Sequence, residues 1–208
     1  MPPADTLLTF IAAALLVGVA PGPDNLYVLA QSLQHGRRAG LWVTLGLCSG
    51  LIAHTLAVVL GVAALVAAST LAFTLLKLAG AGYLLYLAWH ALRAGATQAR
   101  AVAPLRPAQL YRRGVLMNIS NPKVSIFFLA LLPQFASPDY GPLPAQLLLL
   151  GVLFMACTLL VFGLLAVGAG GIGARLLGSA AWQRRLQQLA GVVFIGLSLR
   201  LLLSSRDA

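Results

Sequence analysis

The chain has very few acidic residues. Its 208 residues include 4 Asp and Glu side chains against 14 Lys and Arg, and charged residues make up 9% of the total. Soluble domains average roughly 25% charged residues, so this composition argues against a soluble globular protein. It also argues against a divalent-cation site, which needs several converging oxygen ligands. The four acids are Asp5, Asp24, Asp139 and Asp207.

Cysteine is also scarce, and this scarcity limits the redox chemistry available to the chain. The 2 cysteines are Cys48 and Cys157, and neither belongs to a Cys-x-x-Cys motif. They fall at corresponding places in the two halves of the chain, as they would in a membrane thiol–disulfide oxidoreductase. Buried lone cysteines more often act as small apolar side chains, and we expect that role here.

The chain contains long apolar runs without charged residues. Hydrophobic residues account for 60% of the chain, and residues 39–76 and 140–174 contain no Asp, Glu, Lys or Arg. Each run is longer than the roughly 20 residues that cross a bilayer. We therefore predict an all-α integral membrane protein with one transmembrane domain over residues 1–208. The six expected spans lie near residues 6–34, 41–67, 70–93, 111–135, 144–170 and 185–203.

The positive charge lies between these spans. The net charge is +10, and the arginines of the links occur in the first, third and fifth links, whereas the second and fourth have none. Lys and Arg mark cytoplasmic links in membrane proteins, so we expect the odd links to be cytoplasmic and both termini to lie outside. This distribution indicates membrane orientation and gives no support for a nucleic-acid partner.

Two of the predicted spans contain proline breaks. Residues 20–25 interrupt the first span and residues 118–123 interrupt the fourth. Proline removes a backbone donor, and unpaired backbone groups at membrane depth are tolerated only against protein or a watery cavity. Such breaks at corresponding places in two halves are typical of a transporter's substrate site. They predict two inverted three-helix repeats, near residues 6–93 and 111–203, with the first and fourth helices broken at proline.

A second sequence match supports the repeat. Residues 75–80 resemble residues 186–191, and this alignment places Tyr83 opposite Phe194. The shared order, with a proline break first and the Leu-Ala-Gly match third, favours an internal duplication.

The charges at the breaks match an amino-acid zwitterion. Aligning Pro23 with Pro122 places Asp24 opposite Lys123. Half-helices that begin at a proline present N–H groups that suit a carboxylate, Lys123 adds a full charge, and Asp24 suits an ammonium group. A structural ion pair is the alternative, because charges at membrane depth usually pair. The predicted substrate-binding residues are Pro21, Gly22, Pro23, Asp24, Asn25, Asn118, Asn121, Pro122 and Lys123.

The candidate proton-coupling residues are His54 and Asp24. His54 lies near the middle of the second span, and an imidazole exchanges protons near physiological pH. The alternative role for His54 is a hydrogen bond between helices. No catalytic residue, metal ligand or cofactor is predicted.

Several motifs occur in an order that resembles the LysE/RhtB family of amino-acid exporters. They are residues 21–25, 35–40, 46–54, 80–84, 118–123 and 133–135, with Trp89 and Phe128. The resemblance implies a six-span bacterial inner-membrane protein that exports amino acids using the proton motive force, and the arginine count above places its termini in the periplasm. The chain departs from some members in the fifth span, where residues 155–158 read Met-Ala-Cys-Thr in place of an acid.

Together, the residues and the resemblance predict a secondary transporter and not an enzyme. We expect it to export neutral or small zwitterionic amino acids by proton-coupled alternating access. The expected partners are the amino acid, protons and the lipid bilayer, with a homodimer as an alternative to a monomer. The alternative functions are a divalent-cation exporter of similar architecture and a membrane thiol–disulfide oxidoreductase.

Overall fold

The computed structural model describes residues 1–20, 22–68, 70–95, 102–169 and 179–203, and all regular structure within these ranges is helical. Three described helices are long and apolar enough to cross a bilayer: Arg37–Gly61 of α3 (Arg37–Ala68), α7 (Leu143–Gly168) and α9 (Ala180–Leu203). Two bent helix pairs also pass as broken spans. Since α4 (Thr70–Arg93) is a helix of 24 residues at the predicted third span, the all-α membrane fold is confirmed.

The first span is broken where the sequence predicts. Helices α1 (Ala4–Val19) and α2 (Pro23–His35) meet at 60°. Pro23 is the first residue of α2, a position that leaves no helical hydrogen bond unmade, and Gly22 before it is extended. Pro21, one of the predicted site residues, lies outside the described residues.

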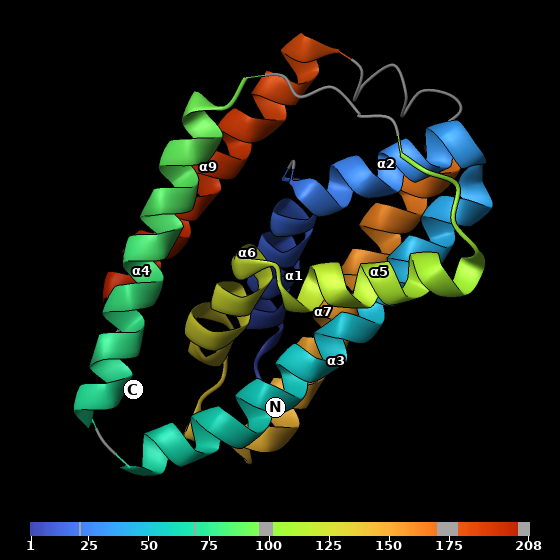
Figure 1. The fold of residues 1–208 in the computed structure, drawn as a ribbon. Coiled ribbons are helices and arrows are strands. Elements are labelled where there is room, and N and C mark those ends of the chain that lie inside the picture. Colours follow the sequence, from blue (N-terminus) through green and yellow to red (C-terminus); the bar gives the residue numbers. More distant parts are fainter. Residues whose placement is uncertain (21, 69, 96–101, 170–178, 204–208) are drawn as a thin grey trace.

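The fourth span is broken in a similar way. Helix α5 (Pro107–Ile119) and the segment Pro122–Phe135 meet at 50°. That segment consists of α6 (Pro122–Ile126), the π-helical turn η1 (Phe127–Leu131) and the 3-10 turn η2 (Leu132–Phe135). Figure 1 shows α5 crossing the long axis of the molecule, with α6 and the turns after it running along that axis.

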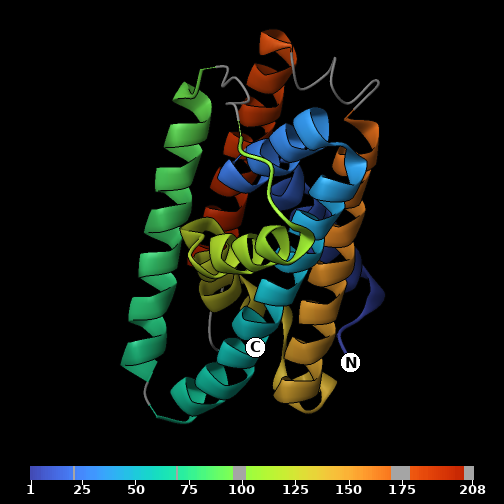
Figure 2. The ribbon, with the colours of Figure 1, turned by 45° about the vertical axis from the view of Figure 1, so that its right-hand side comes forward.

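Helices at corresponding places in the predicted repeats pack against each other. Helix α3 lies along α7, and α4 lies along α9. Each pair runs antiparallel, as the two views in Figures 1 and 2 show. This arrangement agrees with inverted halves, while the repeat boundaries stay a prediction.

Glycines allow α3 and α5 to approach closely. A Cβ added at Gly46 would lie 2.1 Å from the Tyr111 carbonyl oxygen, and one added at Gly114 would lie 2.4 Å from that of Val43. One added at Gly50 would lie 2.7 Å from the Asn118 Cβ. Such backbone contact is the main source of attraction between helices in lipid. It holds the second break against the middle of α3.

An aromatic core supports the breaks from one side. The Phe10 ring of α1 lies 5.1 Å from Phe135, and the Phe127 ring lies 4.9 Å from Phe154 of α7. Phe10, Phe127 and Phe135 are at most 1% exposed. These edge-to-face and tilted ring contacts fix α1, η1 and α7 relative to one another.

Five of the described arginines lie at helix ends at one end of the molecule, whereas Arg112 and Arg113 lie on α5 and Arg200 lies in the last turn of α9. This arginine-rich end carries Arg37, Arg38, Arg93, Arg184 and Arg185 at helix ends (Figure 1). The second and sixth spans were predicted to begin at residues 41 and 185, but their helices begin earlier, α3 at Arg37 and α9 at Ala180. Arginine is a good helix former, so both helices continue through their arginines.

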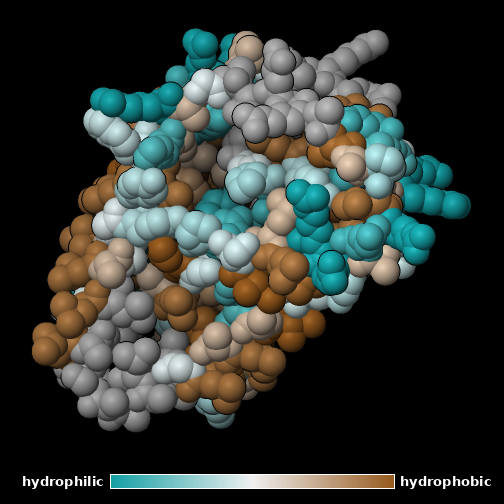
Figure 3. Space-filling view, in the orientation of Figure 1, coloured by the Kyte–Doolittle hydropathy of each residue, from teal (hydrophilic) through white to brown (hydrophobic). Residues whose placement is uncertain are grey.

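The opposite end carries η3 (Pro138–Tyr140), and the Met1 amino group donates a hydrogen bond to the Tyr140 carbonyl there. Figure 3 shows the face that is turned to the viewer in Figure 1, with hydrophobic side chains along its left edge and lower middle and hydrophilic ones at its upper left and right. Exposed Leu71, Leu75, Leu78 and Leu85 form part of the apolar surface of α4.

Candidate substrate site

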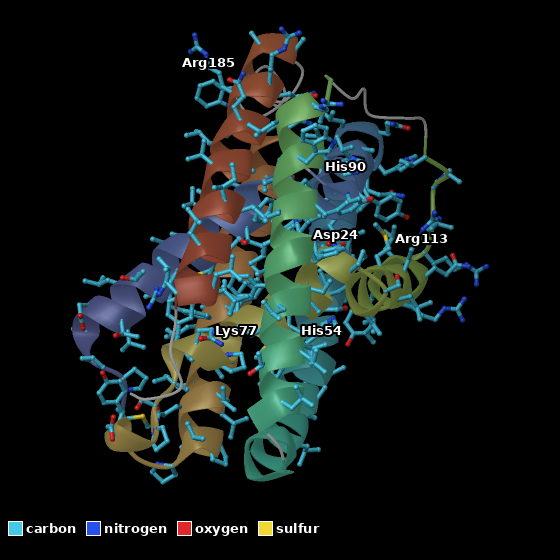
Figure 4. The ribbon with its side chains drawn as sticks, turned by 90° about the vertical axis from the view of Figure 1, so that its left-hand side faces the viewer. Asp24, His54, Lys77, His90, Arg113 and Arg185 are labelled. Atoms are coloured by element: carbon cyan, nitrogen blue, oxygen red, sulfur yellow. The ribbon has the colours of Figure 1, made fainter. Side chains whose placement is uncertain are left out.

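Asp24 lies buried in the first turn of α2. It is 4% exposed, and its Oδ2 accepts a hydrogen bond of 2.6 Å from the Asn121 side-chain amide of the second break. Its Oδ1 is buried and has no hydrogen-bond partner in the described part of the chain. Figure 4 shows Asp24 near the middle of the molecule, between His54 below and His90 above. The acid therefore lies in the interior of the molecule with one of its two carboxylate oxygens unpaired.

Lys123, the base of the second break, reaches across to the first. Its Nζ donates to the carbonyl oxygens of Val17 at 3.2 Å and Ala20 at 3.3 Å. These carbonyls end α1, where the helix dipole favours a positive charge. The Asn25 amide caps the same end by donating to the Gly18 carbonyl at 2.8 Å. The last carbonyls of α1 are thus bound by side chains that follow each break.

Asn121 joins the two charged residues. Its Nδ2 donates to Asp24, and its Oδ1 accepts the Lys123 backbone N–H at 3.0 Å as the N-cap of α6. The amide of Lys123, which we expected to be available to a carboxylate, is therefore occupied by Asn121. Both hydrogen bonds of the Lys123 ammonium go to carbonyl oxygens at the end of α1. Asp24 and Lys123 are therefore connected indirectly, by Asn121, which bonds both residues.

Unpaired oxygen atoms gather around the breaks. Within the described residues, the side-chain oxygens of Asp24 (Oδ1), Asn25 (Oδ1) and Asn118 (Oδ1) are buried without a hydrogen-bond partner. A buried acceptor without a donor costs about 1–3 kcal/mol. An ammonium group carries three donors and no acceptor, so it is the chemical group that this set of oxygens suits.

Two cavities lie beside the breaks. The first has a volume of about 20 Å³ and is lined by Asp24, Asn118 and Lys123 together with Phe154, Thr158 and other side chains. About 10–15 Å³ is enough for one water molecule, so this cavity is water-sized and too small for an amino acid.

The second cavity lies between the breaks and the α4–α9 pair, and we name it the α4/α9 cavity. Its volume is about 280 Å³, and it reaches His90 and Ala94 near the arginine-rich end. Its wall at the breaks consists of predicted site residues: Gly22, Pro23, Asn121, Pro122 and Lys123. Lys123 lines both cavities, so its side chain lies between them.

Comparison with known proteins identifies the family of this chain. The sequence profile of the LysE type translocator family matches residues 15–205. This chain belongs to the LysE-type translocator family. Its membership supports a transporter rather than an enzyme.

The relatives of this translocator include named efflux proteins. A membrane protein of Vibrio cholerae is 37% identical over 193 residues, covering 91% of this chain and 92% of the relative. The homoserine/homoserine lactone efflux protein of Salmonella typhimurium is 34% identical over 184 residues, covering 86% and 84%. The leucine efflux protein of Salmonella choleraesuis is 28% identical over 132 residues, covering 61% of each chain. No solved structure matches the chain.

His54 forms the hydrogen bond that one of its two predicted roles requires. The residue is 9% exposed, its Nε2 lies 3.2 Å from the Asn118 carbonyl oxygen, and its ring lies 5.6 Å from that of Phe128. It thus connects α3 of the translocator to the second break. Its part in proton coupling stays a prediction.

The fifth span contributes a residue that sequence reasoning did not assign to the site. Thr158 is 6% exposed and lines the water-sized cavity with Asp24. The sequence could have pointed to Thr158, because this residue falls in the stretch of the fifth span where some family members have an acid. Cys157 beside it and Cys48 are both free and buried. Among the described residues, no group of three or more His, Cys, Asp or Glu side chains is placed to hold a metal ion.

Proposed function

We propose that the protein exports amino acids from the cytoplasm and binds the zwitterion where its two broken helices meet. The observation that carries this proposal is the set of three unpaired oxygens on Asp24, Asn25 and Asn118, beside the partly buried Lys123. Membership of the LysE-type translocator family gives it independent support.

The two charged groups of an amino acid suit different parts of this site. The ammonium donates to Asp24 Oδ1 and Asn118 Oδ1, which both belong to residues lining the water-sized cavity. The carboxylate takes the Lys123 ammonium from the Val17 and Ala20 carbonyls, which accept its hydrogen bonds. One acid and one base leave the complex neutral, which favours a neutral amino acid. The efflux proteins named for homoserine and leucine fit this class.

The unequal cavities support transport by alternating access. The α4/α9 cavity reaches the arginine-rich end, which we place in the cytoplasm of a bacterial inner membrane by the distribution of its arginines. The water-sized cavity lies on the other side of Lys123 and must widen to pass a substrate. Movement of Lys123 away from the end of α1 is the step that we expect to loosen the first break.

We assign proton coupling first to Asp24. Its unpaired oxygen can hold either a proton or a substrate ammonium, so the two compete for one group. Competition at one site lets an inward proton exchange for an outward amino acid. His54 is the second candidate because it bonds the Asn118 carbonyl beside the same site.

Transport assays in inverted membrane vesicles test the proposal. A panel of labelled amino acids is offered with an imposed pH gradient, and we expect concentrative uptake of neutral members. Vesicles without the protein and vesicles with its Asp24→Asn variant are the controls. Uptake of none of the panel would refute amino-acid export. Accumulation that persists with no pH gradient and no membrane potential would refute proton coupling alone.

Orientation is tested separately with reporter fusions. We expect a periplasmic signal at Ala208 and a cytoplasmic one within residues 95–104. The reverse result would overturn the proposed topology.

A further inference from the structure

A surface groove lies where α5 packs against α3 (Figure 2), and the proposed function does not use it. We name it the α3/α5 groove, and its volume is about 580 Å³. Residues three, four and seven positions apart share one face of a helix, and each helix contributes one such face to the groove. The lining residues are Ser49, Ile52, Ala53 and Leu56 of α3, and Tyr111, Arg112, Val115, Leu116 and Ile119 of α5.

The lining residues follow the same order on both helices. Gly46 of α3 meets Tyr111 of α5, and Gly50, one turn further along α3, meets Asn118. Both helices therefore advance in the same direction along the groove. On each helix the polar lining residues come first and a large aliphatic residue comes last, so the groove has a polar end and an apolar end.

The polar end carries two hydroxyls and a positive charge. The Tyr111 hydroxyl donates to Ser49 Oγ at 2.9 Å, and Arg112 is exposed. Within the described ranges, no hydrogen bond or ion pair engages the Arg112 guanidinium. Arg113, the next residue, instead lies 4.8 Å over the ring of Tyr27 of α2. Arg112 is therefore the cation that this groove presents to a ligand.

The apolar end is open to the surroundings. Ile52, Leu56, Leu116 and Ile119 are 44–59% exposed, which suits contact with lipid chains. Because α3 begins at Arg37, the polar end lies nearer the arginine-rich end of the molecule than the apolar end does. An arginine side chain near a membrane surface can lay its stem on apolar residues and extend its guanidinium to the headgroups.

We propose that the α3/α5 groove binds one anionic phospholipid from the leaflet at the arginine-rich end. Arg112 and the two hydroxyls hold the headgroup phosphate, and an acyl chain lies along the apolar end. Basic pockets between membrane helices bind anionic headgroups in this way. A phospholipid has the same order of polar and apolar parts as the groove, whereas an apolar helix of a second copy would leave Arg112 unpaired against it. The inference goes beyond amino-acid export and does not depend on it.

A lipid in this groove acts on the support of the second break. Its two walls are the helices whose close contact, at Gly50 and Asn118, holds that break. The bound lipid touches both helices, so it binds only while they are packed together. Binding to the packed form alone stabilises the protein by mass action.

The headgroup is tested with purified protein in detergent and added lipid. Native mass spectrometry measures the lipid retained, and we expect the parent to retain phosphatidylglycerol at least about five-fold better than phosphatidylcholine. Arg112→Gln should lose this preference. Arg113→Gln is the matched control, because it removes the same charge from the same helix outside the groove, and it should keep the preference.

The acyl chain is tested by filling the groove. Phosphatidylglycerol should raise the melting temperature of the parent, whereas glycerol phosphate, which has no acyl chain, should not. Ala53→Phe places a ring in the groove and should lose both the stabilisation and the retained lipid. Ala12→Phe, at an exposed alanine of α1 outside the groove, is the control and should keep both.

Four results would overturn the inference. Equal retention of the two lipids by the parent would exclude headgroup recognition, whichever variants fold. Equal loss in Arg112→Gln and Arg113→Gln would assign the attraction to overall charge. Equal stabilisation by glycerol phosphate would exclude a bound chain. A parent dimer that Ala53→Phe converts to monomers would assign the groove to a second copy of the chain.

Discussion

Both breaks contain hydrogen bonds between their own residues, such as that from Asn25 to the Gly18 carbonyl at the first, but the first break also receives hydrogen bonds from Asn121 and Lys123 of the second. At the second break, the Asn121 N–H donates to the Asn118 carbonyl and the Asn121 side chain caps Lys123. At the first, the Val17 and Ala20 carbonyls are bound by Lys123 from the other half of the chain. Asp24 likewise depends on Asn121 for its hydrogen bond.

This difference assigns the two breaks different parts in transport. The second break is supported by α3, through the glycine contacts at Gly46 and Gly50 and the contact of His54 with the Asn118 carbonyl. The first break is held by one lysine and one amide, and it retains unpaired oxygens on Asp24 and Asn25. A substrate that engages Lys123 and Asp24 therefore competes directly with the bonds that keep the first break in place.

The largest effects are expected from the charges. Asp24→Asn and Lys123→Gln should each lower export at least about 100-fold, because removing one partner leaves the other charge uncompensated at membrane depth, at a cost of about 3–5 kcal/mol. Initial rates in vesicles, normalised to inserted protein, measure the loss. Asp139→Asn, at an exposed acid of η3, is the control and should keep parental export. Near-parental rates in either charge variant would contradict a shared role for the two breaks.

Asn121→Ala should have the next largest effect. It removes the N-cap of α6, worth about 1 kcal/mol, and the charge-assisted bond to Asp24, worth about 1.5–3 kcal/mol. Both breaks should loosen, so export and thermal stability in detergent should fall together. Ser120→Ala is the matched control, since the exposed Ser120 hydroxyl bonds only its own helix, at Leu116 and Met117. Equal behaviour of the two variants would mean that Asn121 does not connect the breaks.

Gly46→Ala tests the support of the second break. The added methyl group meets the Tyr111 carbonyl, so α3 and α5 must separate, and overpacking of this kind costs about 1–3 kcal/mol. We expect a lower melting temperature and export reduced several-fold. Gly61→Ala, at a glycine with no atom within 4 Å of an added Cβ, should leave both unchanged. The prediction is wrong if both variants melt at the parental temperature.

The smallest effect is expected from the cysteines. The double variant Cys48→Ala with Cys157→Ala should export within a few-fold of the parent, because neither thiol belongs to either break. Export and membrane insertion are measured in parallel. Complete loss of export with normal insertion would revive the thiol–disulfide alternative.

The sequence predicts the breaks well because their cause is local. Proline removes a backbone donor wherever it stands, so Pro23 and Pro122 identify the interruptions without any knowledge of packing. Long apolar runs likewise identify the helices. The ends of α3 and α9 were placed too far inward because hydropathy falls at arginine, whereas the helical backbone continues through it.

The hydrogen bonds between the two breaks could not be predicted from the sequence. Lys123 was expected to face a ligand carboxylate, but nothing in its neighbourhood along the chain indicates that it binds carbonyls of α1. The bond from Asn121 to Asp24 joins residues far apart in sequence. Contacts of this kind follow from how helices meet, which periodicity and motif spacing do not specify.

Competition by an amino acid that lacks its ammonium charge tests the central claim most directly. A labelled neutral amino acid is transported by the purified protein in proteoliposomes, with its unlabelled form or its N-acetyl derivative as competitor. If the unpaired oxygens around Asp24 bind the ammonium, the unlabelled amino acid should compete fully and the N-acetyl derivative should compete at least about ten-fold more weakly. Equal competition by the two would contradict binding of the zwitterion between the two breaks.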